Sequence, residues 1–517
     1  MEETRPRRNL LQLLAIPVAV QLAVIVWLWP GFLTDWDSYL YSYGALNFEP
    51  VSLGLGRWFY CVFLGIIWRI AQPIFSLDVQ SSWLVFALSS AVLALVNVPL
   101  FFALARRWVD RSTAFVATCL VASSPLIGIY AGAVMTETLT LTLMLGSLLL
   151  VTRRADRAPR IAALVGSAVL FGLACSIREP VVFFFPAYVG LLWNRGLSLR
   201  ALGTHVLLFG CCAGSMILMG WLGAYLTNPT WFDIYHQWKA GMLHERESMV
   251  SGLPSLLFRN LCYYAVFVGV FSPFLVLSIP EQIRWIRRER PVWSLALASG
   301  IGLYTVVELA NHTLAFNPRF VIPAGLFLSI FAAKAIVTQA SNVKLPATWL
   351  APGIVAVHLL LIVAAQPLLN RYLYENKSRP SREVFFSLKN ADNRAVFVPG
   401  ELTPVVEYYH RLYNTRWHIV YAGWCFEAGQ ITQAMESARR RGAGSEFLIV
   451  ERKYWPSQSY RPNHWKTFET LYRSYESAIS ASNVAHFNRV DLSPRHREPN
   501  QTAPPLVAGR PISTGHD

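Results

Sequence analysis

Three charged residues stand beside long apolar stretches, where a charge is costly and therefore often functional. Asp37 follows the first apolar stretch, Glu137 opens a later one, and Arg319 comes just before another. A carboxylate can take a proton from a hydroxyl, and a guanidinium can bind a phosphate through two parallel hydrogen bonds. These residue types fit a substrate with an anionic phosphate and a nucleophile that needs a base.

Each of these residues also has a structural explanation. Asp37 is followed by Tyr41 and Ala45 on one helical face, and Asp is a favoured helix N-cap. Glu137 could complement the dipole at the start of its helix. Arg319 could extend from a helix end towards water. Spacing alone leaves both interpretations open.

Two further segments mix charges with aromatic residues. Arg178 and Glu179 are adjacent in a tight turn between apolar stretches, where a local ion pair is the commoner arrangement. The segment 223–256 suits contact with a sugar, and it equally suits a helix lying on the membrane surface. Its His236 and His244 are eight residues apart, and neither has a clear metal partner.

The composition shows which elements must position these residues. The chain has 517 residues, of which 54% are hydrophobic and 15% charged, against about 25% charged in soluble domains. The formal net charge is +15, but short basic clusters interrupted by apolar stretches exclude a nucleic-acid partner. Seven Cys, mostly in apolar stretches, predict no disulfide framework. We therefore expect a polytopic membrane protein.

A bilayer core requires about 20 apolar residues per helix. Eleven segments have about that length, so we predict about 11 transmembrane helices, at 10–30, 82–105, 112–131, 133–152, 160–178, 180–194, 201–222, 257–280, 291–310, 320–338 and 346–366.

Lys and Arg cluster in every second loop between these segments. Because cytoplasmic loops carry the excess of Lys and Arg, the alternation predicts a cytoplasmic N-terminus. Asp37, Glu137 and Arg319 then all lie at the outer face. Residues 57–75 could nearly span the membrane, but a crossing there would reverse every later loop. We interpret them as an amphipathic interfacial helix with Arg57 and Arg69 towards the headgroups; a buried re-entrant helix would leave the topology unchanged.

The composition changes after the last predicted span. Helical patterns alternate with three strand-like runs, at 394–400, 417–423 and 445–451. We predict three parts: a transmembrane domain at 1–366, a small extracytoplasmic α/β domain with a parallel sheet at 367–490, and a disordered tail at 491–517.

The order of these motifs resembles the GT-C class of membrane glycosyltransferases, particularly the protein O-mannosyltransferase and aminoarabinose-transferase group. Those proteins carry an acid after the first span with an aromatic residue four positions on, as in DSYLYSYGA from Asp37. They also carry an acid at the start of the fourth span, which Glu137 in YAGAVMTETLTL matches. PRFVIP resembles their last outer arginine element at Arg319. The resemblance covers about 10–340, and Ser38 stands where the family often has a second acid.

The resemblance implies a donor sugar on a polyprenyl phosphate or diphosphate, with the lipid in the membrane. It implies that Asp37 is the general base, with Asp35 ranked second, and that a hexosyl or pentosyl group passes to an acceptor hydroxyl with inversion. Arg319, with Arg178 or Arg57, would stabilise the leaving phosphate, and Glu137 would orient the acceptor or hold a cation. A divalent metal is left open, because some members of the class use one and others do not.

The sugar and the acceptor, whether glycan, lipid or protein, stay undetermined. The principal rival class is a transporter or lipid flippase, although no matched halves are found. A third class is a sensor or assembly protein whose outer α/β domain does the work. The scarcity of paired Cys favours a bacterial plasma membrane over a eukaryotic secretory lumen.

Overall fold

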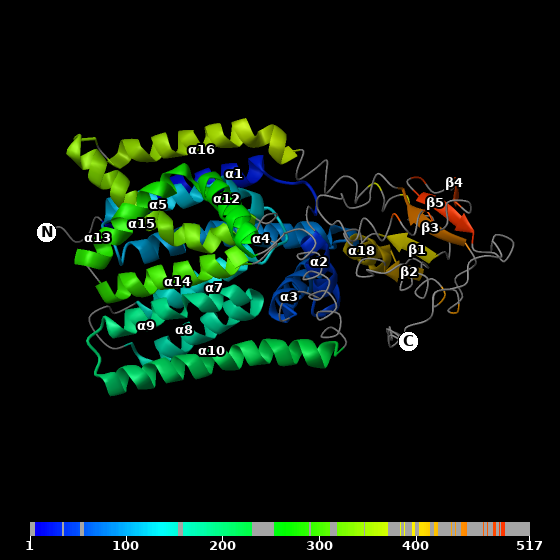
Figure 1. The fold of residues 1–517 in the computed structure, drawn as a ribbon, viewed down its shortest axis with the longest axis horizontal. Coiled ribbons are helices and arrows are strands. Elements are labelled where there is room, and N and C mark those ends of the chain that lie inside the picture. The colour runs from blue at the N-terminus through cyan, green and yellow to red at the C-terminus, as the bar shows by residue number, and fades with distance from the viewer. Residues whose placement is uncertain are drawn as a thin grey trace. The chain divides into compact units, whose positions relative to one another are not determined.

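The structure is a computed structural model. It describes residues 6–370 apart from 34–35, 52–55, 153–158, 230–252, 289–290, 311–317 and 346, and, after residue 370, one helix, five strands and a few single positions. The chain divides into two compact units, Met1–Arg379 and Pro380–Asp517 (Figure 1).

All the regular elements that the structure describes in the first unit are helices. Its elements are α1 (Pro6–Trp27), α2 (Trp36–Asn47), α3 (Trp58–Phe75), η1 (Val79–Ser81), α4 (Ser82–Ala105), α5 (Arg111–Ala122), α6 (Pro125–Ala131), α7 (Glu137–Val151), α8 (Ile161–Ile177), η2 (Glu179–Phe184), α9 (Phe185–Trp193), α10 (Leu199–Thr227), α12 (Leu253–Phe271), η3 (Pro273–Leu277), α13 (Ser278–Arg288), α14 (Pro291–Ala310), η5 (Pro318–Val321), α15 (Ile322–Asn342) and α16 (Ala347–Asn370).

Five of these helices are long and apolar enough to cross a membrane, or seven if each of two bent pairs counts as one span. Five shorter helices are also apolar. The chain is therefore an integral membrane protein with many apolar helices. The count of eleven crossings stays a prediction, although each predicted segment coincides with helical structure.

Two of the predicted spans are bent. α5 and α6 meet at 57°, and α12 meets η3 and α13 at 108°. The predicted spans at 112–131 and 257–280 are therefore each formed by helices that meet at a bend, which the sequence analysis did not foresee. The physical reason is proline: Pro125 and Pro273 follow the breaks, and proline donates no backbone hydrogen bond and starts a new helix more readily than it continues one.

The helical unit is built from helices packed side by side. α8 lies between α7 and α10, α7 packs on α4, and α14 packs on α9. α5 contacts both α15 and α16, and α1 packs on α4 and α5. Figure 1 shows α10, α14 and α16 running in nearly the same direction, with α2 and α3 at one end of them.

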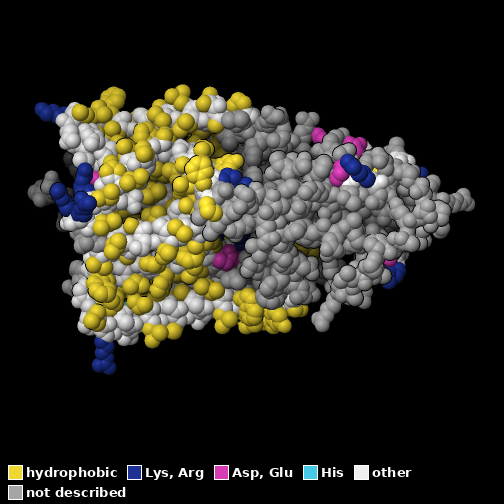
Figure 2. All heavy atoms as spheres, in the orientation of Figure 1, with side chains coloured by type: hydrophobic (Ala, Val, Ile, Leu, Met, Phe, Trp, Pro, Cys, Tyr) yellow, Lys and Arg dark blue, Asp and Glu magenta, His cyan; other side chains and the backbone are white. Residues whose placement is uncertain are grey.

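The surface of this unit suits a bilayer. Figure 2 shows hydrophobic side chains over the flank of the helices, and Lys and Arg at the end where Figure 1 places α13. Large apolar side chains on α10 and α16 are exposed, among them Leu207, Leu226 and Leu360. Apolar flanks between polar ends are what a membrane requires, because exposed leucines gain nothing from contact with water.

The helix α3 differs in one respect from its predicted form. It is 18 residues long and apolar enough to span a membrane, so its interfacial placement stays a prediction. Arg69 is exposed and donates to the carbonyl of Leu46 on α2 at 3.3 Å. The expectation that Arg57 faces the headgroups is wrong: its side chain is only 12% exposed, because its guanidinium contacts Tyr41 and Glu179.

The second unit contains a five-stranded sheet of order β2-β1-β3-β5-β4. Its elements are β1 (Ala395–Val398), α18 (Thr403–Tyr413), β2 (His418–Tyr421), β3 (Glu446–Val450), β4 (Ile479–Ala481) and β5 (Phe487–Asp491).

The sheet is mixed. β1, β2 and β3 lie in the three runs predicted as strands and are parallel, as the intervening helix α18 favours. β5 pairs antiparallel with β3 and with β4, so the purely parallel sheet that we expected is wrong. Helical sequence patterns also occur at 430–441 and 464–478; most of both segments, and the tail after 491, lie outside the described residues.

Candidate active site

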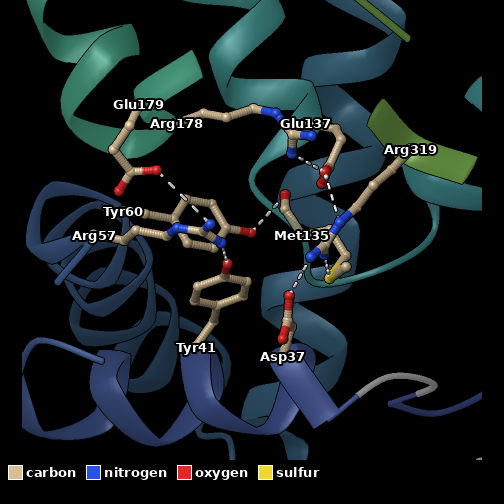
Figure 3. A network of polar contacts seen from close by, with 9 residues as sticks. All are labelled: Asp37, Tyr41, Arg57, Tyr60, Met135, Glu137, Arg178, Glu179 and Arg319. Atoms are coloured by element: carbon tan, nitrogen blue, oxygen red, sulfur yellow. Dashed lines mark hydrogen bonds and ion pairs between the residues drawn. The ribbon is translucent and has the colours of Figure 1, made fainter. Parts of the chain in front are cut away.

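Four buried charged side chains meet in the helical unit, each from a different part of the chain (Figure 3). Asp37 comes from α2, Glu137 opens α7, Arg178 follows α8, and Arg319 lies on η5. We call these four residues the Arg319 cluster. They were all predicted as site residues, and tertiary structure brings them together across as many as 282 positions of sequence.

Arg319 is the centre of the cluster. Its Nη2 lies 2.5 Å from Oδ2 of Asp37, and its Nε lies 3.5 Å from Oε1 of Glu137. The same Oε1 lies 2.5 Å from Nη1 of Arg178. Two carboxylates therefore balance two guanidinium groups, which buried charges require because desolvation is otherwise prohibitive.

These contacts show that a helix-end role does not account fully for Asp37 or Glu137. Asp37 is the second residue of α2, and its carboxylate reaches across to η5 instead of serving only its own helix. Glu137 does lie in the first turn of α7, where an acid is favoured, but its Oε1 is shared by two arginines. Both acids thus carry tertiary contacts beyond a local helix-end role.

The sequence favoured a local ion pair between Arg178 and Glu179, but the ion pairs seen among the described residues join each of them to another partner. Arg178 pairs with Glu137, whereas Oε2 of Glu179 lies 3.9 Å from Nη2 of Arg57. The turn after α8 explains this, because Arg178 has an extended backbone and Glu179 begins η2. The two side chains consequently point to different partners in Figure 3.

An aromatic ring lies beside both arginines of the cluster. The guanidinium carbon of Arg178 is 4.7 Å from the centre of the Phe320 ring, and that of Arg319 is 5.4 Å away. Such contacts stabilise a cation by about 0.5–2 kcal/mol, most where water is excluded. Phe320 is the aromatic residue of PRFVIP, and no residue pattern singled it out as part of a site.

Arg57 and Tyr41 form a second polar group, which adjoins the Arg319 cluster through α2. Arg57 donates to the hydroxyl of Tyr41, which stands one turn after Asp37. Burial raises the pKa of the Tyr41 phenol, against the opposing effect of Arg57, so the hydroxyl stays neutral. Arg57 itself has a φ of 45°, a region that non-glycine residues seldom occupy and that is often found at functional sites.

Tyr60 connects this second group with the cluster. Its ring packs edge-on against Tyr41, with centroids 4.9 Å apart. Its hydroxyl donates to the carbonyl of Met135 at 2.8 Å, and the sulfur of Met135 lies 3.6 Å from Nη1 of Arg319. Local sequence does not mark Tyr60 or Met135 as members of a site, because only the fold brings them here.

The remaining predicted site residues cannot be placed in the cluster. Asp35 lies outside the described residues, as do His236, His244 and most of the segment 223–256. Arg57 lies beside the cluster, where its ion pair is with Glu179.

The described residues contain no group of three His, Cys, Asp or Glu that could hold a metal ion. The two carboxylates that might share a cation, Asp37 and Glu137, instead have the guanidinium of Arg319 between them. A cation at that position would be repelled by Arg319. These residues therefore do not fit a metal in this arrangement, and we derive no step through one.

Part of the sequence matches a known family. Residues 66–221 match the family described as dolichyl-phosphate-mannose-protein mannosyltransferase. The match includes Glu137 and Arg178 but neither Asp37 nor Arg319. Comparison with curated protein sequences gives no match.

Solved structures share the fold. ArnT from Cupriavidus metallidurans, bound to undecaprenyl phosphate, is 14% identical and matches with a TM-score of 0.57, over 92% of this chain and 97% of its own. The oligosaccharyltransferase of Archaeoglobus fulgidus tethered with an acceptor peptide has 14% identity and a TM-score of 0.54, over 89% and 71%. The archaeal oligosaccharyltransferase AglB, in complex with an inhibitory peptide and a dolichol-phosphate, has 11% identity and a TM-score of 0.51, over 85% and 69%. The chain therefore resembles the GT-C class of membrane glycosyltransferases, and it has the fold of ArnT.

Proposed function

We propose that this protein is a glycosyltransferase that moves a hexosyl or pentosyl group from a polyprenyl-phosphate donor to an acceptor hydroxyl at the outer membrane face. The observation that carries the proposal is the buried Arg319 cluster, which combines a carboxylate for proton transfer with guanidinium groups for a phosphate. The shared fold supports it, because ArnT is bound to undecaprenyl phosphate.

In this proposal Asp37 is the general base. The acceptor oxygen forms a bond to the anomeric carbon while the bond from that carbon to the phosphate oxygen breaks. The bonding electron pair leaves with the polyprenyl phosphate, and the hydroxyl proton passes to the Asp37 carboxylate. Attack from the side opposite the phosphate inverts the anomeric configuration.

Arg319 links donor binding to this step. Its Nη2 is 2.5 Å from the Asp37 carboxylate, so the base is engaged in an ion pair in the structure. A donor phosphate adds negative charge beside a cluster that is already balanced, and it competes with Asp37 for Arg319. Transfer of Arg319 to the phosphate both stabilises the leaving group and frees the base.

Glu137 has an oxygen suited to a substrate hydroxyl. Its Oε1 contacts both arginines, while its Oε2 is buried and has no hydrogen-bond partner among the described residues. A buried acceptor left unpaired costs about 1–3 kcal/mol. We propose that an acceptor or sugar hydroxyl donates to Oε2, which makes Glu137 the residue that orients the substrate. Arg178 and Arg57 complete the positive surface for the phosphate, and Asp35 is the second candidate for the base.

The placement in the membrane is part of the same proposal. The alternation of Lys and Arg favours a cytoplasmic N-terminus, about eleven crossings, and an outer position for both the cluster and the second unit. We propose a bacterial plasma membrane as the location, a transmembrane domain at 1–366, an extracytoplasmic α/β domain at 367–490 and a disordered tail at 491–517.

The test incubates the purified protein with a panel of polyprenyl-phosphate sugars and with lipid, glycan and peptide acceptors, and measures released polyprenyl phosphate. Three proteins are compared: wild type, Asp37→Asn and Asp78→Asn. Asp78 is exposed and precedes η1, so Asp78→Asn makes the same chemical change away from the cluster.

We expect release by wild type and Asp78→Asn, and its loss in Asp37→Asn. Equal release by all three proteins would exclude Asp37 as the base and move the role to Asp35 or Glu137. Movement of intact donor between the leaflets of protein-containing vesicles, without cleavage, would overturn the proposal in favour of a flippase.

A further inference from the structure

A histidine is fully buried in the apolar helix α16. The buried side chains of this helix form one stripe, and they are Ala351, Ile354, His358 and Ile362. Among them, His358 is the polar one. A polar, ionisable group among apolar residues of a membrane helix is costly unless its hydrogen bonds are satisfied, and it therefore calls for an explanation.

Both nitrogens of His358 bond to serines on other helices. Nδ1 lies 2.6 Å from Oγ of Ser123, and Nε2 lies 2.9 Å from Oγ of Ser272. Both serines are fully buried. We call these three residues the His358 network.

The two serines occupy the breaks of the two bent spans. Ser123 directly follows α5, before α6 departs at 57°, and Ser272 directly follows α12, before the 108° bend. Each serine is followed by a proline within two residues, at Pro125 and Pro273. One side chain on a third helix therefore connects both breaks.

The hydrogen bonds favour one position for the ring proton. The hydroxyl of Ser123 lies 2.6 Å from the carbonyl of Cys119, which can only accept. Donation there leaves the Ser123 oxygen to accept from Nδ1–H of His358, and Nε2 of the neutral ring then accepts from the hydroxyl of Ser272. Every donor in this chain of bonds has an acceptor.

Packing contacts connect the break at Ser272 with the Arg319 cluster through α15. Phe271, the last residue of α12, is fully buried and packs on Gly325 of α15. A Cβ at Gly325 would lie 2.9 Å from the Phe271 ring, so the two helices approach closely only because this residue is glycine. α15 directly continues η5, which carries Arg319.

The break at Ser123 is connected with the Arg319 cluster through α6. α6 ends at Ala131, and four residues later Met135 places its sulfur 3.6 Å from Arg319. α6 and α12 also both contact η5. Fixing the two breaks relative to each other therefore fixes the two helices that lie against the Arg319 segment.

We propose that His358 is a positioning residue: as a neutral Nδ1–H imidazole, it joins the two breaks and thereby sets the position of Arg319 relative to Asp37 and Glu137. This role rests on the proposed function, because Arg319 is the group being positioned. His358 bonds to the two serines and not to the Arg319 cluster, so its effect on turnover is transmitted through α6, α12 and η5.

The first test determines the tautomer of His358 and requires no substrate. The protein is labelled with ¹⁵N-histidine, reconstituted in lipid, and examined by solid-state NMR, with His358→Leu identifying the resonance. Wild type and Ser272→Ala are expected to show the Nδ1–H tautomer. Ser123→Ala removes the acceptor for that hydrogen, so the proton is expected to move to Nε2 and to be donated to Ser272.

The second test measures turnover with the polyprenyl-phosphate sugar that wild type cleaves. His358→Leu is expected to lower kcat about 10- to 100-fold, the effect of misplacing a reacting group by about 1 Å, with the donor KM nearly unchanged. His358→Asn keeps a nitrogen donor bonded to Cγ, as Nδ1 is, and should recover part of the loss. Ser329→Ala is the matched control, because Ser329 is a buried serine whose hydroxyl donates to the carbonyl of Gly325 on its own helix.

The two tests can overturn different parts of the proposal. An Nε2–H or a charged ring in wild type overturns the network, whatever the protein catalyses. A folded His358→Leu protein with the kcat of wild type, or a change confined to KM, overturns the positioning role. If wild type cleaves no donor, the proposed function fails, and the NMR result still decides the structure of the network.

Discussion

The Arg319 cluster and the His358 network are both buried, and both join residues from distant parts of the chain. The Arg319 cluster consists of charges, and within the described part of the chain Oε2 of Glu137 has no hydrogen-bond partner. The His358 network is neutral, and each of its donors has an acceptor. In the proposed function a substrate hydroxyl bonds to Oε2 of Glu137, whereas the His358 network needs no further partner.

A third buried group lies elsewhere in the helical unit and helps to separate these two types. Glu281 on α13 is buried and contacts Arg284 at 2.7 Å and Lys334 at 3.8 Å. Like the Arg319 cluster, this group pairs a buried carboxylate with basic side chains. Here, however, Arg284 is 48% exposed, and Lys334 lies over the ring of Trp285. This group combines one acid with two basic side chains without enclosing a site, and we expect it to act in structure alone.

The largest effect on stability is expected from Arg319→Ala, because it leaves two buried carboxylates with only Arg178 as a partner. Removing one partner of a buried pair costs about 3–5 kcal/mol. The double variant Arg319→Ala/Asp37→Asn removes one of the orphaned charges and should recover much of that loss in thermal melts, without recovering turnover. Equal melting temperatures for the single and double variants would contradict the pairing.

A smaller loss is expected from Ser272→Ala, because Nε2 of His358 then has no donor. A buried acceptor without a partner costs about 1–3 kcal/mol. Combined with His358→Leu, the effect of Ser272→Ala should nearly vanish, since the acceptor is gone in both proteins. Additive shifts in a double-mutant cycle would show that the two side chains act independently.

The sequence drew attention to the individual candidate residues but not to their partners. Asp37, Glu137 and Arg319 stood out because charges beside apolar stretches are rare. Arg178 was expected to pair with its neighbour Glu179, yet it reaches Glu137, 41 positions away. Local patterns carry no information on which distant side chain completes a pair, so Tyr60, Met135 and Phe320 were also not recognised.

For the fold too, local features could be predicted from the sequence, whereas features set by tertiary contacts could not. The eleven apolar stretches and three of the strands were visible because hydrophobic periodicity is local. The breaks at Ser123 and Ser272 were not predicted, although Pro125 and Pro273 offered a signal. A proline in an apolar stretch can bend a helix or be accommodated within it, as Pro99 is in α4, and the choice depends on tertiary hydrogen bonds such as those of His358. β4 has only three residues and directly follows a helical pattern, which hid it; β5 is as long as β3 and was missed all the same.

A moderate effect is expected at the helix cap of α5. Asp110 accepts from the backbone amides of Ser112 and Thr113 and from the Thr113 hydroxyl. Partial burial opposes its ionisation, but these hydrogen bonds prevail and lower its pKa. Asp110→Ala should cost about 1 kcal/mol at neutral pH.

The sign of the pH dependence follows from the lowered pKa. The stabilisation is complete above the unfolded carboxyl pKa of about 3.9 and is lost as the pH falls through the lower folded value. The difference in melting temperature between wild type and Asp110→Ala should therefore be constant near neutral pH and shrink in acid. A difference that grows in acid would contradict the capping role.

The smallest effect is expected from Glu281→Gln. Gln keeps an acceptor for Arg284, and an ion pair that reaches water contributes less than about 1 kcal/mol. We expect a slightly lower melting temperature and an unchanged kcat. A large loss of turnover would show that the Glu281 group takes part in function and would remove the distinction drawn between it and the Arg319 cluster.

The central claim is that Asp37 takes the proton and competes with the donor phosphate for Arg319. The most direct measurement is the affinity for a polyprenyl-phosphate sugar, determined alongside the rate of polyprenyl-phosphate release, in wild type and Asp37→Asn. Because the amide side chain of the Asp37→Asn variant is neutral and competes less for Arg319, the account predicts donor binding at least as tight as in wild type and a release rate lower by about 10²–10⁴-fold. Release at the wild-type rate, or loss of donor binding together with turnover, would contradict it.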